Sequence, residues 1–249
     1  MVESLAMAID QEYASQIRKE IGIFAAWLPN ALIEIGQYGQ LQGALFQPQR
    51  QLKGLYAKPN PAKATYDFTI HADRAINTDA KALVQAGVTS GNALLEVSFQ
   101  KEAAVTFSAP DCEIKRVDDL RALGEKLIAM KEAGSFQKDD CIVVEVVTAP
   151  KATIIASLKS GAEVKFEVGA KTPISAQVMA NLDEASSLKI SKGVGAKVIG
   201  EGPLTPLFRL AFLKSHLLSS PTIAFRGPKG ELVEGEKVQV TDSEYLEIY

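Results

Sequence analysis

The sequence has few of the residues that usually build catalytic or metal sites. Its 249 residues include two histidines and two cysteines, with no CxxC motif and no Cys/His cluster. Structural zinc sites gather such side chains at short spacings. Ser215 and His216 are adjacent, but they lack a GxSxG turn, and neighbouring residues on a strand point to opposite faces. We therefore predict no catalytic residue, no metal site and no cofactor, which means a chain that is not an enzyme.

The sequence also has no large excess of positive or negative residues and no long apolar run. The chain has 27 Lys and Arg against 30 Asp and Glu. Nucleic-acid binders need a basic excess, so we expect no nucleic-acid partner. No stretch approaches the roughly 18 apolar residues of a transmembrane helix, and the first residues lack the pattern of a signal peptide. With Cys112 and Cys141 expected as reduced, partly buried thiols, this predicts a cytoplasmic chain as made.

The hydrophobic pattern predicts two helices. Residues 8–28 carry apolar side chains at three- to four-residue steps and are followed by Pro29. A second helix is expected near residues 115–133, with Asp118 and Asp119 in its first turn and Gly134 at its end. The first helix either packs permanently on the core or exchanges that contact for a membrane surface.

Strict alternation of apolar and polar residues predicts several strands, each with one buried and one wet face. The alternating stretches are 66–73, 95–100, 163–168, 174–183 and 188–191, and residues 141–147 form an additional apolar run. We expect the polar set to be exposed and the apolar set to be buried; the two sets are Asp67, Thr69, Glu163 and Lys165, and Phe68, Ile70, Val164 and Phe166. The predicted class is α+β, with a twisted, mainly antiparallel sheet, an N-terminal amphipathic helix and a central helix.

The end of the chain differs in charge from the rest. Residues 231–249 hold six acids and one base, a charge of −5, so residues 1–230 carry −3 + 5 = +2. We interpret residues 1–230 as a single α+β domain. The acidic segment is either a solvated terminus or a segment that folds over a mildly basic body and restrains it.

The order of elements resembles the pore-forming domain of the gasdermin family. The stretches that carry the resemblance are Leu120-Arg121 with Gly124 in the central helix, then Val143-Val144-Glu145-Val146-Val147, then Ser220-Pro221-Thr222-Ile223-Ala224-Phe225-Arg226. The length is similar to that of compact bacterial members, in which one pore-forming domain is followed by a short inhibitory segment.

This resemblance implies a soluble precursor of a membrane β-pore, a cell-death and antiviral defence effector activated by release of its C-terminal segment. The implied partners are membrane lipid after activation, further copies of the chain and an activating protease, and the activated form is membrane-associated. Blocks 64–108 and 152–200 would supply the transmembrane β-strands. The alternative is a soluble, non-catalytic α+β binding or scaffold protein.

Individual residues are implied by the same resemblance. The membrane-contact candidates are Ile17, Arg18, Lys19, Ile21, Phe24, Phe68, Ile70, Val97, Phe99, Val164, Phe166 and Val178. The candidates for inhibitory contacts, all in the acidic segment, are Tyr245, Leu246 and Tyr249.

Overall fold

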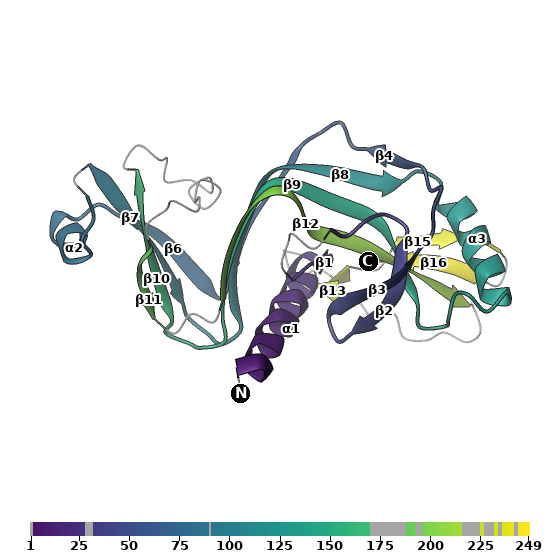
Figure 1. The fold of residues 1–249 in the computed structure, drawn as a ribbon, viewed down its shortest axis with the longest axis horizontal. Coiled ribbons are helices and arrows are strands. Elements are labelled where there is room, and N and C mark those ends of the chain that lie inside the picture. The colour runs from purple at the N-terminus through teal and green to yellow at the C-terminus, as the bar shows by residue number, and fades with distance from the viewer. Residues whose placement is uncertain are drawn as a thin grey trace. The chain divides into compact units, whose positions relative to one another are not determined.

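The fold is α+β and mainly antiparallel, as predicted (Figure 1). The computed structural model describes residues 2–27, 32–89, 91–169, 188–192, 196–215, 225–226, 232–233, 236–241 and 244–249. The expected strand at 174–183 and His216 lie outside these residues.

The chain divides into two compact units. Unit 1 comprises residues 1–16, 64–112 and 149–204, and unit 2 comprises residues 17–63, 113–148 and 205–249. Four long elements therefore contribute residues to both units: α1 (Val2–Ile21), β8 (Ala104–Val117), β9 (Cys141–Ser157) and β12 (Ala196–Ser215).

Unit 1 contains a four-stranded antiparallel sheet in the order β11-β10-β7-β6 (Figure 1). Its strands are β6 (Ala72–Asn77), β7 (Asn92–Phe99), β10 (Glu163–Gly169) and β11 (Leu188–Lys192). A short helix, α2 (Ala80–Gln85), follows β6 and is capped by the side chain of Asp79. Strand β5 (Ala64–Ile70) belongs to the other large sheet and pairs antiparallel with the first part of β8.

The register of the four-stranded sheet separates an apolar from a polar face. Val164 pairs with Val97 and Phe166 with Leu95, whereas Lys165 pairs with Glu96. Val164, Phe166 and Ile70 are buried and Thr69 is exposed, as expected, while Glu163 and Lys165 are partly exposed. Alternating side chains in a strand point to opposite faces, so this register agrees directly with the sequence pattern.

Unit 2 is built on strands in the order β15-β16-β12-β9-β2-β3, with the second part of β8 pairing with β4. Its shorter strands are β1 (Phe24–Ala25), β2 (Gln37–Gln42), β3 (Leu45–Gln51), β4 (Ala57–Pro59), β15 (Glu236–Gln239) and β16 (Glu244–Ile248). Strands β13 (Phe225–Arg226) and β14 (Leu232–Val233) form a separate two-stranded ribbon.

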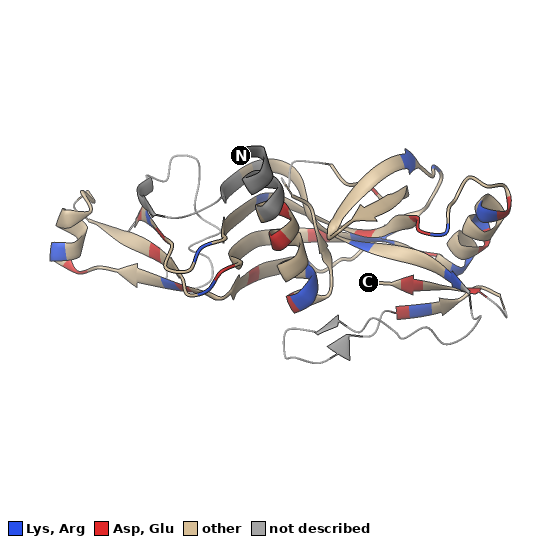
Figure 2. Cartoon of the chain, turned by 90° about the horizontal axis from the view of Figure 1, so that it is seen from below, with Lys and Arg blue, Asp and Glu red and all other residues tan. Residues whose placement is uncertain are grey.

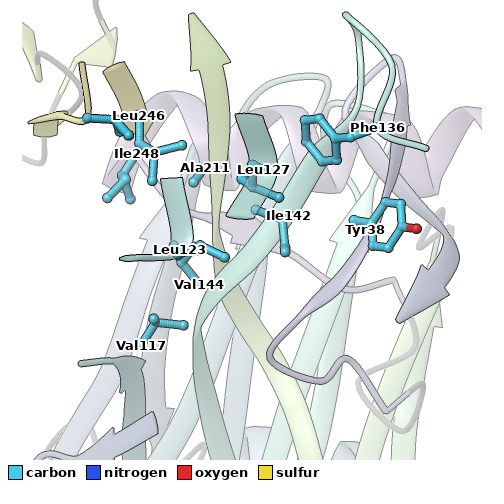
Figure 3. Close-up of a cluster of buried hydrophobic side chains, with 11 residues drawn as sticks. Tyr38, Val117, Leu123, Leu127, Phe136, Ile142, Val144, Ala211, Leu246 and Ile248 are labelled. Atoms are coloured by element: carbon cyan, nitrogen blue, oxygen red, sulfur yellow. The ribbon is translucent and has the colours of Figure 1, made fainter. Parts of the chain in front are cut away.

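Helix α3 (Leu120–Glu132) covers part of this sheet. Its buried side chains Leu123 and Leu127 share a core cluster with Ile142 and Val144 of β9 and Leu246 of β16 (Figure 3). A second cluster in unit 2 is aromatic, because Phe208 lies with its ring centroid 5.8 Å from both Phe24 and Phe46. Both clusters are made of residues that are distant in sequence.

Helix boundaries differ from the sequence-based expectation at both helices. The first helix ends at Ile21 because Gly22 takes a positive φ of 72°, and Phe24 then pairs with Phe208 as part of a strand. The central helix begins at Leu120, since Asp119 is its N-cap and accepts from the backbone N–H of Ala122. Val117 consequently ends strand β8 instead of starting the helix.

Strand β9 is longer than expected. The apolar run that the sequence shows covers residues 141–147, but β9 continues through Pro150 to Ser157. The fixed φ of proline is compatible with extended backbone, so a single proline is a weaker stop for a strand than for a helix.

Candidate functional site

The membrane-contact candidates of unit 1 lie on strands whose apolar faces are covered. Val97 and Phe99 of β7 and Val164 and Phe166 of β10 are almost completely buried in one cluster, and Ile70 of β5 is buried as well. Phe68 is half-buried and stacks on Phe107 at a centroid distance of 5.0 Å. Val178 lies outside the described residues.

The opposite face of the same sheet is charged. The Lys165 ammonium lies 2.7 Å from a carboxylate oxygen of Glu163 and 3.2 Å from one of Glu96. Hydrogen bonding to these carboxylates raises the pKa of Lys165. One face of the two paired hairpins is therefore apolar and the other is ionic, an arrangement that also suits strands between lipid and water.

The remaining candidates surround the end of α1 and the beginning of unit 2. Ile17 and Phe24 are fully buried, Ile21 and Arg18 are half-buried, and Lys19 is exposed. The Arg18 guanidinium lies 4.3 Å from the ring centroid of Phe24. Burial lowers the pKa of Arg18, although an arginine remains charged at any ordinary pH.

Two of the three candidates for inhibitory contacts, Tyr245 and Leu246, belong to the last strand, and Tyr249 directly follows it. In β16, Leu246 pairs with Leu213 of β12 and is fully buried, while Tyr245 is half-buried. Tyr249 is buried against Phe212 in an edge-to-face arrangement, and its ring centroid lies 6.0 Å from the Arg18 guanidinium. The end of the chain therefore reaches the basic end of α1 within unit 2.

Ion pairs connect the acidic C-terminal segment, residues 231–249, to the rest of unit 2. Glu244 contacts the ammonium of Lys131 on α3 at 2.5 Å, and Glu236 pairs with Arg116 on β8. Both pairs are partly exposed, so each contributes at most about 1 kcal/mol. Acidic and basic residues are interspersed along the described helices and strands (Figure 2).

Gly124 of α3 provides a close contact with the C-terminal segment. A Cβ added to this glycine would lie 2.3 Å from Cγ2 of Val240, which is itself buried. Such a distance forces one of the two elements to move. The helix thus needs glycine here, although glycine costs about 1 kcal/mol relative to alanine in a helix interior.

We expect Gly124→Ala to destabilise the protein by about 1–2 kcal/mol despite the higher helix propensity of alanine, because overpacking exceeds the propensity gain. Urea unfolding followed by circular dichroism measures this change. The double variant Gly124→Ala/Val240→Ala should recover most of the loss, since it removes the colliding methyl groups. A single variant more stable than the parent would contradict the close packing of α3 on Val240.

The expectation that the Asp67 side chain is exposed is wrong. Its side chain is only 5% exposed, and its carboxylate oxygen lies 2.6 Å from the Arg74 guanidinium. The sequence pattern placed Asp67 on a wet face, but a basic side chain from the next strand meets it there. The sequence analysis gave no role to Arg74, Arg116 or Lys131 and did not anticipate the contact of Gly124 with Val240, because each of these contacts depends on which element the fold places beside the residue.

The two cysteines are free thiols, buried in strands β8 and β9. Burial raises the pKa of Cys112 to about 11 and that of Cys141 to about 12. Both thiols donate to backbone carbonyls, Cys112 to Ala109 and Cys141 to Gly39. Neutral buried thiols are poor nucleophiles, so these cysteines act as core residues.

Among the described residues, no group of three or more metal-ligating side chains lies together. None of the described helices is both long enough and apolar enough to cross a membrane. The fold defines the class of the protein as α+β with a mainly antiparallel sheet. Comparison of the sequence with protein-family models gives no match, and comparison with curated proteins gives none either.

Proposed function

We propose that this chain is the soluble precursor of a membrane β-pore, a cell-death and defence effector similar to bacterial gasdermins. The observation that carries the proposal is the pair of antiparallel hairpins β6–β7 and β10–β11 in unit 1. Their paired strands place Val97 and Val164 on one face and Glu96 and Lys165 on the other. Strands in a pore need this pattern, with apolar side chains toward lipid and polar ones toward water.

In this proposal the hairpins lengthen before they insert. Strands β7 and β10 have 8 and 7 residues, whereas a strand needs roughly 9–11 residues to span the hydrocarbon. Backbone groups left unpaired in lipid cost several kcal/mol each, so neighbouring copies of the chain would pair their hairpins laterally. The pore is therefore a homo-oligomer, and the chain is cytoplasmic before activation.

The C-terminal segment restrains the precursor in this mechanism. It adds β16 and β15 to the edge of the sheet next to β12 and covers Arg18 with Tyr249. Loss of the segment would leave β12 with an unpaired edge and would change the charge of the remaining chain to +2. A basic surface then favours anionic lipid by about 1 kcal/mol for each cation near the membrane.

Leakage of dye from anionic liposomes tests the proposal. A cleavage site engineered after Gly230 lets the chain fold first and be cut afterwards, as an activating protease would do. We expect the cut chain to release dye and the uncut chain to release none, with less release from neutral liposomes. Leu246→Ala in the cut chain should lower the protein concentration needed for dye release, because it weakens the packing of the C-terminal segment on the rest of the chain.

Size-exclusion chromatography supplies the control for this experiment. It reports whether the cut segment has left the body and whether the body assembles on lipid. A body that has lost residues 231–249, remains folded and monomeric, and never binds lipid would contradict the pore. It would favour the alternative of a non-catalytic binding or scaffold protein.

A further inference from the structure

Within the part of unit 1 that the structure describes, three connections join the two sheets, and each passes through a residue with positive φ. These residues are His71 between β5 and β6 (φ 53°), Ala103 between β7 and β8 (φ 57°), and Gly161 between β9 and β10 (φ 71°). Two of the three carry a Cβ, which makes this backbone conformation unfavourable. We call this region the corner.

An ion pair spans the corner. Asp67 lies on β5 in one sheet, and Arg74 lies on β6 in the other, with Oδ1 and Nη1 2.6 Å apart. Arg74 pairs with Val97 in the register of the four-stranded sheet, so it projects from the apolar face of that sheet. Asp67 is the group that compensates a cation in this position.

The ion pair and a straight strand exclude each other. Asp67 and Arg74 are seven residues apart. In one continuous strand, residues at an odd spacing point to opposite faces, and these two would lie roughly 23 Å apart along it. The contact therefore exists only while the positive φ of His71 turns the chain between β5 and β6.

The face around Asp67 gives an independent reason to expect a second conformation. Ser108 and Thr106 of β8 pair with Asp67 and Thr69. Both hydroxyls are fully buried, and neither has a hydrogen-bond partner among the described residues. Keeping such groups from water is unfavourable, so a form in which this face meets water would gain free energy.

We infer that the Asp67–Arg74 ion pair is a latch that holds the corner closed and must open before β5 and β6 join into one strand. The latch itself is a property of the folded precursor, and only the insertion of the opened strands into a membrane rests on the proposed function. Asp67 and Arg74 therefore control how fast the precursor converts to the form in which β5 and β6 are one strand.

Hydrogen exchange of the uncut chain tests the latch without any membrane. In Asp67→Asn and in Arg74→Met, amides of residues 70–77 and of Gln100, which bonds to the His71 carbonyl, should exchange at least about tenfold faster. Amides of residues 141–147 in unit 2 should not change. The matched control is Lys165→Met, which breaks ion pairs inside one sheet and should leave residues 70–77 unchanged.

The double variant Asp67→Asn/Arg74→Met separates a latch from general damage. If the two changes acted independently, the fold increase in exchange at residues 70–77 of the double variant would equal the product of the two single fold increases. We expect it to be at least about tenfold smaller than that product, because each single change already breaks the same contact. If a single variant fails to fold, the double variant, which leaves no unpaired charge, is compared directly with the parent. Independent effects, or exchange equal to that of the parent, would overturn the latch.

Leakage by the cut chain then distinguishes the two proposals. Asp67→Asn should release dye several-fold faster than the parent after cleavage. Fast exchange with no leakage from any variant would remove the pore function and keep the latch. Leakage by the parent, with variants that match it in both exchange and leakage, would keep the pore and remove the latch.

Discussion

Leu246→Ala should lower the free energy of unfolding by about 3 kcal/mol. Leu246 is fully buried and shares a core cluster with Leu123 of α3, Val144 of β9 and its neighbour Ile248 (Figure 3). Truncating a buried leucine removes its transfer free energy and leaves a cavity, which together cost about 2–5 kcal/mol. Urea or guanidinium unfolding, monitored by circular dichroism, measures the loss.

Lys237→Ala is the matched control for this variant. Lys237 lies on the neighbouring strand β15 and is exposed, so its loss should change stability by no more than about 0.5 kcal/mol. Equal effects of the two changes would mean that the C-terminal segment does not share the core of unit 2. That result would also remove the physical basis for restraint by this segment.

Val97→Lys should destabilise unit 1 by about 4 kcal/mol or more. Val97 is fully buried between Val164 and Arg74 on neighbouring strands. A lysine there buries an unpaired charge next to an existing cation, which belongs to the most damaging class of substitution. Limited proteolysis of residues 64–112, together with urea unfolding, reports the effect.

At the adjacent position, Ser98, a lysine should not destabilise the protein. Ser98 is exposed and pairs with Glu163 and Asp73 on the two neighbouring strands. Ser98→Lys should therefore be neutral or stabilising by a few tenths of a kcal/mol through cross-strand charge pairs. If Ser98→Lys were the damaging change and Val97→Lys the neutral one, the register of β7 would be shifted by one residue.

The candidate site was predictable where it depends on alternation. The sequence identified Val97, Val164 and Phe166 as one apolar set, because period-two patterning is a local property of each strand. It also identified Leu246 and Tyr249 as apolar residues of an acidic segment. Their partners were not predictable, since the contacts of Val240 with Gly124 and of Glu244 with Lys131 each join positions more than a hundred residues apart.

Apolar spacing gave wrong predictions where the same residues fit both a helix and a strand. Phe24 continues the helical period of α1, yet Gly22 ends the helix and Phe208 draws Phe24 into a strand. Val117 likewise fits the stripe of α3 but ends β8. Apolar spacing gives no preference in such cases, and tertiary pairing decides between helix and strand.

By itself, the sequence determined the fold class, the strand periodicity and the central helix, because side-chain alternation and helix capping act over a few residues. Only the tertiary structure decided that residues 66–73 bend at His71, that Asp67 is buried, and that Arg74 is its partner. Positive φ is uncommon even for histidine, which is among the residues enriched there, so His71 alone does not predict the bend. The burial of a carboxylate depends on which cation the fold brings to it. Those outcomes are set by packing between strands, which no local pattern encodes.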